Sequence, residues 1–284
     1  MSDLLTVKNL NKQFPDFALQ DVSFNLQPGF IMGFIGPNGA GKTTTIKMIL
    51  NMLRRNSGEI RIFDQDNLAG ESEIKPRIGI VMDQPFYVDD WNLHAVESAV
   101  APFYPAWDRA HYSRLLHDFD LNPAKKVKEL SRGMKVKLML AVALSHDARL
   151  LILDEPTSGL DPIARSELME ILSDFIQDEQ KGVLFSTHIT ADLEKVADFI
   201  TFIQNGRIIF TGRKDDLMER YCVVKGGPAE MTPELRRQLA GCREYASGFE
   251  GLIRTEHIRN LAPGLLAEQA SLDEIIVRLN KETI

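Results

Sequence analysis

Residues 33–45 read GFIGPNGAGKTTT, and within them Gly36 to Thr43 match the pattern GxxxxGK[ST] at every fixed position. An apolar run precedes this stretch and apolar residues at helical spacing follow it, which is the strand–turn–helix context that the motif requires. The glycines let backbone N–H groups converge on a phosphate, and the following helix N-terminus adds a positive dipole. The stretch therefore predicts a phosphate-binding loop formed by Gly36, Pro37, Asn38, Gly39, Ala40, Gly41, Lys42, Thr43 and Thr44.

Three side chains of this loop have individual expected roles. Lys42 is expected to bridge the β- and γ-phosphates of a nucleotide, the Thr43 hydroxyl to ligate Mg²⁺, and Thr44 to donate to a phosphate. The competing structural interpretation is an ordinary glycine-rich turn with a surface lysine. The complete set of fixed positions favours the phosphate site.

The stretch LLILDEP at 150–156 supplies the second candidate group. Asp154 ends an apolar run and is expected to hold Mg²⁺, through water, beside the phosphate loop. Glu155 follows directly and is a candidate general base for an attacking water. A strand that ends in two solvated acids is the alternative, and the presence of the phosphate loop makes it the weaker one.

Composition places the chain among globular proteins: 284 residues, 44% hydrophobic and 26% charged. Its formal net charge of −7 argues against a nucleic-acid partner, which selects for basic surfaces. Cys222 and Cys242 lack zinc-site spacing and are expected to be free thiols in a reducing compartment. We expect neither a signal peptide nor a membrane span.

The pattern of apolar residues predicts an α/β fold. Three N-terminal runs, LLTVKNL, ALQDVSFNLQ and GFIMGFI, predict antiparallel strands with one exposed face. The uninterrupted runs RLLILD and GVLFST predict strands buried in a parallel sheet, with SELMEILSDFIQ as the helix between them. ITFIQNGRIIFTG predicts a hairpin with a type I′ turn at Asn205-Gly206. Helix starts are expected at Thr232-Pro233-Glu234 and at Ser271.

A third motif indicates which family of nucleotide-binding proteins the sequence resembles. LSRGMK at 130–135 resembles the LSGGQ signature of ABC-type ATPases. In the same order as in that family, SGLD at 158–161 resembles its D-loop and His188 in FSTHI its switch histidine. An acidic or glutamine loop at 83–84 and an aromatic upstream of the phosphate loop also fit. The sequence is identified as a member of this family along roughly residues 4–217.

The resemblance implies an ATPase that binds ATP and Mg²⁺ and works as a pair of cassettes, either a homodimer or a heterodimer with a related cassette. Two subunits would face each other head to tail, so that Ser131 and the Gly133 N–H approach the γ-phosphate in trans. His188 would contact the same phosphate in cis. Asp161 would communicate between the two sites, with helix capping before Pro162 as the alternative.

Several positions depart from the family pattern or leave a choice open. The second signature glycine is Arg132 and the signature glutamine is Met134. Asp83 stands where the family has glutamine, and Asp83 and Gln84 are both candidate Mg²⁺ ligands. Phe14 is the expected adenine-stacking aromatic, with Phe17 as the alternative and a core phenylalanine as the structural interpretation.

The resemblance also predicts an integral membrane permease as partner. Residues 1–221 are expected to form an ABC ATPase domain, whose helical subdomain at about 86–147 contacts the permease. Residues 222–284 are expected to form a small α/β accessory domain. Aromatic residues at 85–108 suit an interface, or alternatively the subdomain core. FYPAWD with LSRGMK resembles single-cassette exporters of Gram-positive bacteria, which implies a cytoplasmic subunit held at the inner face of the membrane.

The sequence is also compatible with two other classes of function. The first is a soluble ABC ATPase that acts on ribosomes or DNA, although the chain has one phosphate loop and no sustained heptads. The second is a nucleotide-gated regulator that hydrolyses ATP poorly, for which Arg132 and Asp83 are the only support.

Overall fold

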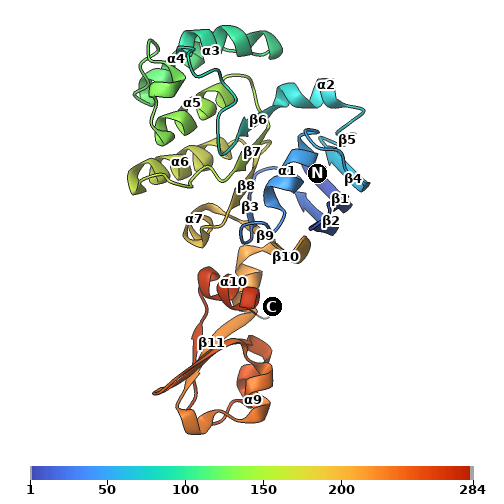
Figure 1. The fold of residues 1–284 in the computed structure, drawn as a ribbon, viewed down its shortest axis with the longest axis vertical. Helices are drawn as coiled ribbons and strands as arrows, with labels where there is room; N and C mark the ends of the chain where they lie inside the picture. The colour runs from blue at the N-terminus through green and yellow to red at the C-terminus, as the bar shows by residue number, and fades with distance from the viewer. Residues whose placement is uncertain (1, 282–284) are drawn as a thin grey trace.

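The computed structural model describes residues 2–281 and arranges them around three β-sheets. Figure 1 shows an elongated molecule in which the elements up to β10 form the larger part and those from β11 onward form a smaller part at one end. The larger part contains the predicted phosphate loop.

The central sheet has six strands in the order β10-β9-β3-β8-β7-β6. Its pairs are parallel except for the hairpin β9–β10. The strands are β3 Ile31–Ile35, β6 Ile78–Val81, β7 Leu150–Asp154, β8 Gly182–Thr187, β9 Phe199–Gln204 and β10 Arg207–Arg213. Strands β3, β7 and β8 are buried at every residue, which explains their uninterrupted apolar sequences.

The second sheet is antiparallel, in the order β2-β1-β4-β5. Its strands are β1 Leu5–Gln13, β2 Ala18–Leu26, β4 Ser57–Ile62 and β5 Gln65–Asp66. The prediction that GFIMGFI belongs with these antiparallel strands is wrong, because β3 pairs in parallel with β8 and β9. A strand that is apolar at successive positions can be buried on both faces, and the centre of the parallel sheet provides this environment.

Helices cover these sheets and form a separate helical layer. Those packed near the sheets are α1 Lys42–Ile49, α2 Glu71–Ile74, α6 Pro162–Phe175, α7 Thr190–Val196 and α8 Lys214–Glu219, with the 3₁₀ turn Lys75–Arg77. The helical layer contains α3 Leu93–Val100, α4 Arg109–Asp118 and α5 Arg132–Leu144, with the 3₁₀ turns Ala101–Phe103 and Val127–Glu129. This layer has its own apolar cluster, which includes Leu93, Tyr112 and Leu138.

The hairpin and the helix starts confirm local predictions. Asn205 and Gly206 have φ angles of 47° and 75°, as the two central residues of a type I′ turn require. Gly206 is also packed tightly, because a Cβ there would lie 1.9 Å from the Ala18 carbonyl oxygen. The Thr232 hydroxyl accepts a hydrogen bond from the Leu235 N–H at 3.1 Å at the start of a helix.

The smaller part is built on an antiparallel sheet of order β12-β13-β11-β14. Its elements are β11 Tyr221–Gly226, β12 Ala240–Tyr245, β13 Gly248–Arg254, β14 Leu266–Gln269, α9 Pro233–Gln238 and α10 Leu272–Lys281, with 3₁₀ turns at Pro228–Glu230 and Thr255–Asn260. The Glu274 N–H donates to the Ser271 hydroxyl at 3.2 Å, as the predicted helix start requires. Residues of α10 and β13 join the apolar cluster of the central sheet, so the two parts share a core.

Candidate active site

The phosphate loop connects the carboxyl end of β3 to the first turn of α1. Gly41 has φ of 113°, a conformation that L side chains rarely adopt, and a Cβ there would lie 2.5 Å from Leu19 Cδ2. Gly36 is equally confined, since its Cβ would lie 2.2 Å from the Ile203 carbonyl oxygen. Two of the predicted glycines are therefore required by the packing of the loop. Asn38 and Gly39 lie at its exposed tip.

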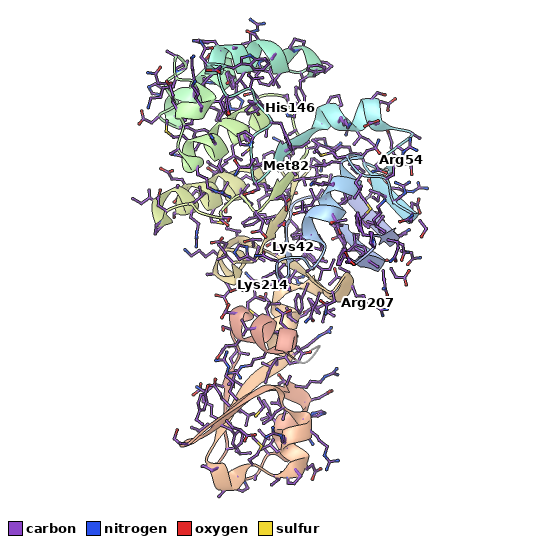
Figure 2. The ribbon with its side chains drawn as sticks, in the orientation of Figure 1. Lys42, Arg54, Met82, His146, Arg207 and Lys214 are labelled. Carbon is purple, nitrogen blue, oxygen red and sulfur yellow. The ribbon has the colours of Figure 1, made fainter. Side chains whose placement is uncertain are left out.

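Lys42 lies at the start of α1 and is only 5% exposed. Its Nζ donates to the Gly36 carbonyl oxygen at 2.7 Å and lies 3.1 Å from Glu155 Oε1. The side chain therefore folds back over its own loop. In Figure 2, Lys42 lies near the middle of the molecule, in the region where the central sheet meets the smaller part. A buried ammonium requires such partners, because an unpaired buried charge is strongly unfavourable.

Asp154 ends β7 and is 2% exposed. The Ser186 hydroxyl of the adjacent strand donates to its Oδ1 at 3.0 Å, and the Thr43 hydroxyl forms a second hydrogen bond with this carboxylate. Burial raises the pKa of Asp154, and these two hydrogen bonds partly oppose that rise. The structure thus joins two predicted Mg²⁺ ligands, and it adds Ser186, which the sequence analysis missed. The signal for Ser186 was a polar residue near the end of a buried strand.

Glu155 connects two other predicted catalytic residues. Its Oε1 lies near Lys42, and its Oε2 lies 2.7 Å from His188 Nδ1. The Glu155 backbone has φ of 51°, which is uncommon for a residue other than glycine, and its N–H donates to the Ser186 carbonyl oxygen at 3.0 Å. Such backbone strain is concentrated at functional sites. The result is a Lys–carboxylate–His chain at the carboxyl edge of the parallel sheet.

The Lys42, Glu155 and His188 side chains are arranged so that Glu155 could activate a water molecule. An ionised carboxylate has no proton to donate, so the Glu155–His188 contact requires the imidazole to donate from Nδ1. The same carboxylate is 16% exposed, so it is shielded but reachable by water. Its position beside the Lys42 ammonium suits a group that orients or deprotonates a water near a phosphate.

The signature and D-loop residues are helix caps in this structure. Ser131 caps α5, with its hydroxyl accepting from the Met134 N–H at 3.2 Å. Asp161 caps α6 and accepts from the N–H groups of Ile163 and Ala164, which lowers its pKa. The capping role considered for Asp161 is therefore present. Among the described residues, no hydrogen bond or ion pair joins Ser131, Gly133 or Asp161 to residues 36–44.

Asp83 and Gln84 are both exposed just after β6. Asp83 forms an ion pair with Arg132, so two of the three residues that depart from the family pattern contact each other. Within residues 2–281 there is no group of three or more His, Cys, Asp or Glu side chains that could hold a metal. Of the predicted Mg²⁺ ligands, Thr43 and Asp154 interact with each other, whereas Asp83 is paired with Arg132.

The two candidate adenine-binding phenylalanines lie on one turn. The Phe14 N–H donates to the Phe17 carbonyl oxygen at 2.8 Å, and the two ring centroids are 6.3 Å apart. Phe17 is the ring that reaches the phosphate loop, because its Cζ lies 3.1 Å from the Cβ position at Gly41. Lys12 Nζ lies 5.5 Å from the Phe14 ring centroid.

A cavity of about 350 Å³ lies between the helical layer and the sheet. Its lining is mainly apolar and includes Met82, Phe86, Tyr104 and His146; Figure 2 labels Met82 and His146 in this region. Phe86 is 74% exposed. His146 is buried, stacks on Tyr104 with centroids 3.8 Å apart, and has a pKa lowered by burial.

The aromatic residues at 85–108 divide between both predicted roles. Tyr87 and Trp107 pack against the cluster of the helical layer, whereas Phe86 and Phe103 are exposed. Every helix in residues 2–281 is too short or too polar to span a bilayer.

Comparison with known proteins finds chains similar to this one. The ABC transporter family model matches residues 19–158. The chain is 34% identical over 263 residues to the bacitracin transport ATP-binding protein BcrA of Bacillus licheniformis, a match that covers 89% of this chain and 85% of that relative. It is 35% identical to the lantibiotic transport ATP-binding protein SrtF of Streptococcus pyogenes, covering 75% of this chain and 92% of that relative.

A solved structure of the ATP-binding subunit of an ABC transporter is also similar. It is 32% identical, with a TM-score of 0.69, and the match covers 75% of this chain and 91% of that chain.

Proposed function

This chain belongs to the ABC transporter family as an ATP-binding subunit that hydrolyses ATP, and we propose that it closes with a second ATPase subunit on two ATP molecules to drive a separately encoded membrane permease. The observation that carries the mechanism is the contact of Glu155 with both Lys42 and His188. It supports a reaction in which water attacks the γ-phosphate in line and the leaving group is ADP.

In this mechanism the phosphate loop binds ATP and the Glu155 carboxylate activates the attacking water. Backbone N–H groups of the loop and Lys42 hold the β- and γ-phosphates, and Thr44 donates to a phosphate oxygen. Glu155 accepts a proton from the attacking water. His188 orients that carboxylate through Nδ1, and its other nitrogen faces the γ-phosphate. The ion pair of Lys42 with Glu155 would be exchanged for contacts with phosphate when ATP binds.

Mg²⁺ fits the donors that the structure brings together. The Thr43 hydroxyl and the buried Asp154 carboxylate present hard oxygen atoms, the ligand type that Mg²⁺ prefers. Thr43 would hold the ion directly and Asp154 through water, with Asp83 and Gln84 as further candidate ligands. A bound Mg²⁺ would neutralise charge on the β- and γ-phosphates.

The dimeric site explains residues that are distant from the phosphate loop in one subunit. Ser131, the Gly133 N–H and the N-terminus of α5 would meet the γ-phosphate bound by the facing subunit. Asp161, at the N-terminus of α6, would connect the two sites. For the adenine, Phe14 is the proposed stacking ring and Phe17 the alternative. The Phe17 ring lies beside Gly41, which supports Phe17 as that alternative.

The permease is proposed to dock at the helical subdomain, in the cavity that Phe86 lines. An apolar cavity with an exposed aromatic at its rim is suited to receive a helix from a partner. Export of a peptide antibiotic is the proposed direction and cargo, supported by the relatives named for bacitracin and lantibiotic transport. The subunit would then lie on the cytoplasmic face of the membrane, held there by the permease.

We also propose a division at residue 221. The sheet formed by β11 to β14 supports an accessory domain at 222–284, and the preceding sheets and helices support an ATPase domain at 1–221. The accessory domain has no motif residue of the ATPase and is proposed to be non-catalytic.

The first experiment is Glu155→Gln. The amide keeps the shape of the side chain but cannot accept a proton from water, so hydrolysis should fall at least about 100-fold. ATP binding and ATP-dependent dimerisation should persist, because neither needs the base. A Glu155→Gln chain that hydrolyses ATP at the wild-type rate would show that another group is the base.

A further inference from the structure

The two charged residues that replace the family's usual signature glycine and loop glutamine contact each other. Arg132, in the signature, forms an ion pair through its Nη2 with the Asp83 carboxylate, 49 positions earlier in the chain. In the family pattern that the sequence resembles, both positions are uncharged: a glycine in LSGGQ and a glutamine in the loop. Two departures that are paired in space are best explained by one joint role.

The Arg132 side chain extends from the signature, past the D-loop, to Asp83. Arg132 is the first residue of α5, directly after the cap Ser131. Its Cδ passes 3.1 Å from the Cβ position of Gly159 in SGLD, where φ is 70°. Its side chain therefore lies over the D-loop and ends at the loop after β6. One residue physically joins the signature, the D-loop and the Asp83 loop.

Stability does not explain this arrangement. The two side chains are 35% and 54% exposed, and exposed ion pairs contribute little to folding. A cation in the first turn of a helix also opposes the positive end of the helix dipole. A nearby anion offsets that repulsion, and Asp83 is the anion that this subunit provides. An anion of higher charge can take its place.

We propose that Arg132 is an ATP-binding residue: Asp83 holds its guanidinium within one subunit, and the γ-phosphate of ATP in the facing subunit competes with Asp83 for it. The proposal rests on the head-to-tail dimer proposed above. Ser131 and Gly133 flank Arg132, so a phosphate that reaches Ser131 and the Gly133 N–H also comes within reach of the guanidinium. Phosphate binds a guanidinium through paired N–H donors and carries more charge than a carboxylate.

The competition has a consequence for the rest of the site. While Asp83 holds Arg132, the loop after β6 stays attached to the start of α5. Capture of Arg132 by phosphate frees that loop, which continues into Phe86 and the cavity proposed for the permease. ATP-driven closure and the permease-facing loop are thereby linked through one ion pair.

A double-mutant cycle on the full-length chain tests the competition, with KM for ATP and kcat as separate readouts. Asp83→Asn should lower KM about two- to fivefold, since the guanidinium no longer has to leave a carboxylate. Arg132→Met should raise KM by a similar factor. Combined with Arg132→Met, the Asp83→Asn change should leave KM unaltered. Arg132→Lys keeps the charge without the planar fork and should give an intermediate KM.

Two results of the same double-mutant cycle would contradict competition between Asp83 and phosphate for Arg132. If Asp83→Asn changes KM by an equal factor with and without Arg132, the two residues act independently and the proposal is wrong. If Asp83→Asn changes only kcat, Asp83 acts on the chemical step as a metal or water ligand and does not compete for Arg132. A wild-type chain that neither hydrolyses ATP nor dimerises with it would instead contradict the proposed function.

Discussion

His188 Nδ1 lies 2.7 Å from Glu155 Oε2, so the histidine after β8 and the carboxylate after β7 are joined at the edge of the sheet. This contact uses the Nδ1 proton of the imidazole for Glu155, so Nε2 donates to a phosphate only when the ring is protonated to the imidazolium. The two residues are 33 positions apart and meet because β7 and β8 are parallel neighbours.

His188→Ala should lower kcat by roughly 100-fold, because the carboxylate loses the group that orients it and the phosphate loses a donor. ATP binding should change much less, since the phosphate loop and Lys42 are intact. Equilibrium binding of a fluorescent ATP analogue, measured beside the hydrolysis rate, separates the two effects. A variant that binds ATP poorly but turns over at the normal rate would exclude the proposed orientation of Glu155.

Asp154→Asn should stabilise the chain while it abolishes Mg²⁺-dependent hydrolysis. Burial raises the pKa of Asp154, so the folded state binds its proton more readily than the unfolded state does. For such a group the free energy of unfolding falls as pH rises through the folded-state pKa, where the buried carboxylate must ionise. The amide cannot ionise and avoids this cost.

The measurement is thermal unfolding of both chains from pH 3.8, the ordinary pKa of an aspartate, up to neutral pH. We expect the variant to gain about 2 °C in Tm at neutral pH. That gain should shrink towards low pH, where Asp154 is protonated in the wild type. A Tm difference that is independent of pH would mean that the effect comes from packing or from the Ser186 hydrogen bond.

Phe86→Ala should weaken the association with the permease and leave ATP hydrolysis by the isolated subunit unchanged. Phe86 is 74% exposed and lines the cavity, so its loss removes apolar contact area from the partner without disturbing the core. Phe103→Ala is the matched control, because Phe103 is 77% exposed but does not line the cavity. Co-purification of each variant with the permease gives the comparison. Equal losses would place the docking surface elsewhere.

Thr190→Val should loosen the attachment of the accessory domain. The Thr190 hydroxyl, in the first turn of α7, donates to Asp273 Oδ1 in α10 at 2.7 Å. Figure 1 shows α10 returning from the smaller part towards α7. Removing a partly buried hydrogen bond to a charged group should reduce the free energy of unfolding by about 2 kcal/mol.

Thr190→Ser keeps the hydroxyl and is the control in chemical denaturation. Because α7 starts two residues after His188, the valine variant should also alter kcat, whereas the serine variant should not. An unchanged kcat in a destabilised valine variant would show that the accessory domain only supports the fold.

Much of the fold could be predicted because it is encoded locally. The hairpin at Asn205-Gly206, the helix starts at Thr232 and Ser271 and the strand before Asp154 each follow from residue types at short spacing. The strand GFIMGFI was assigned to the wrong sheet, because its apolar residues indicate that it is buried but not which strands pair with it.

The candidate site likewise contains residues that the sequence predicted and contacts that it did not. The order of GAGKTT, LSRGMK, LILDEP and STH was sufficient to identify the family and the ATPase, because each motif sets its own backbone geometry on a strand end or a helix start. Ser186 beside Asp154, and Asp273 beside Thr190, were not foreseeable. Their partners are 32 and 83 positions away, and only the strand order and the return of α10 bring them together.

The sequence by itself determined that this protein holds a nucleotide by its phosphates and belongs to the ABC ATPases, because those features depend on residues that are close in the chain. The tertiary structure alone decided that Glu155 joins Lys42 to His188, that Asp83 holds Arg132, and that Phe86 is exposed while Trp107 is packed. These are contacts between separate elements, and their existence depends on how the sheets and helices pack against one another.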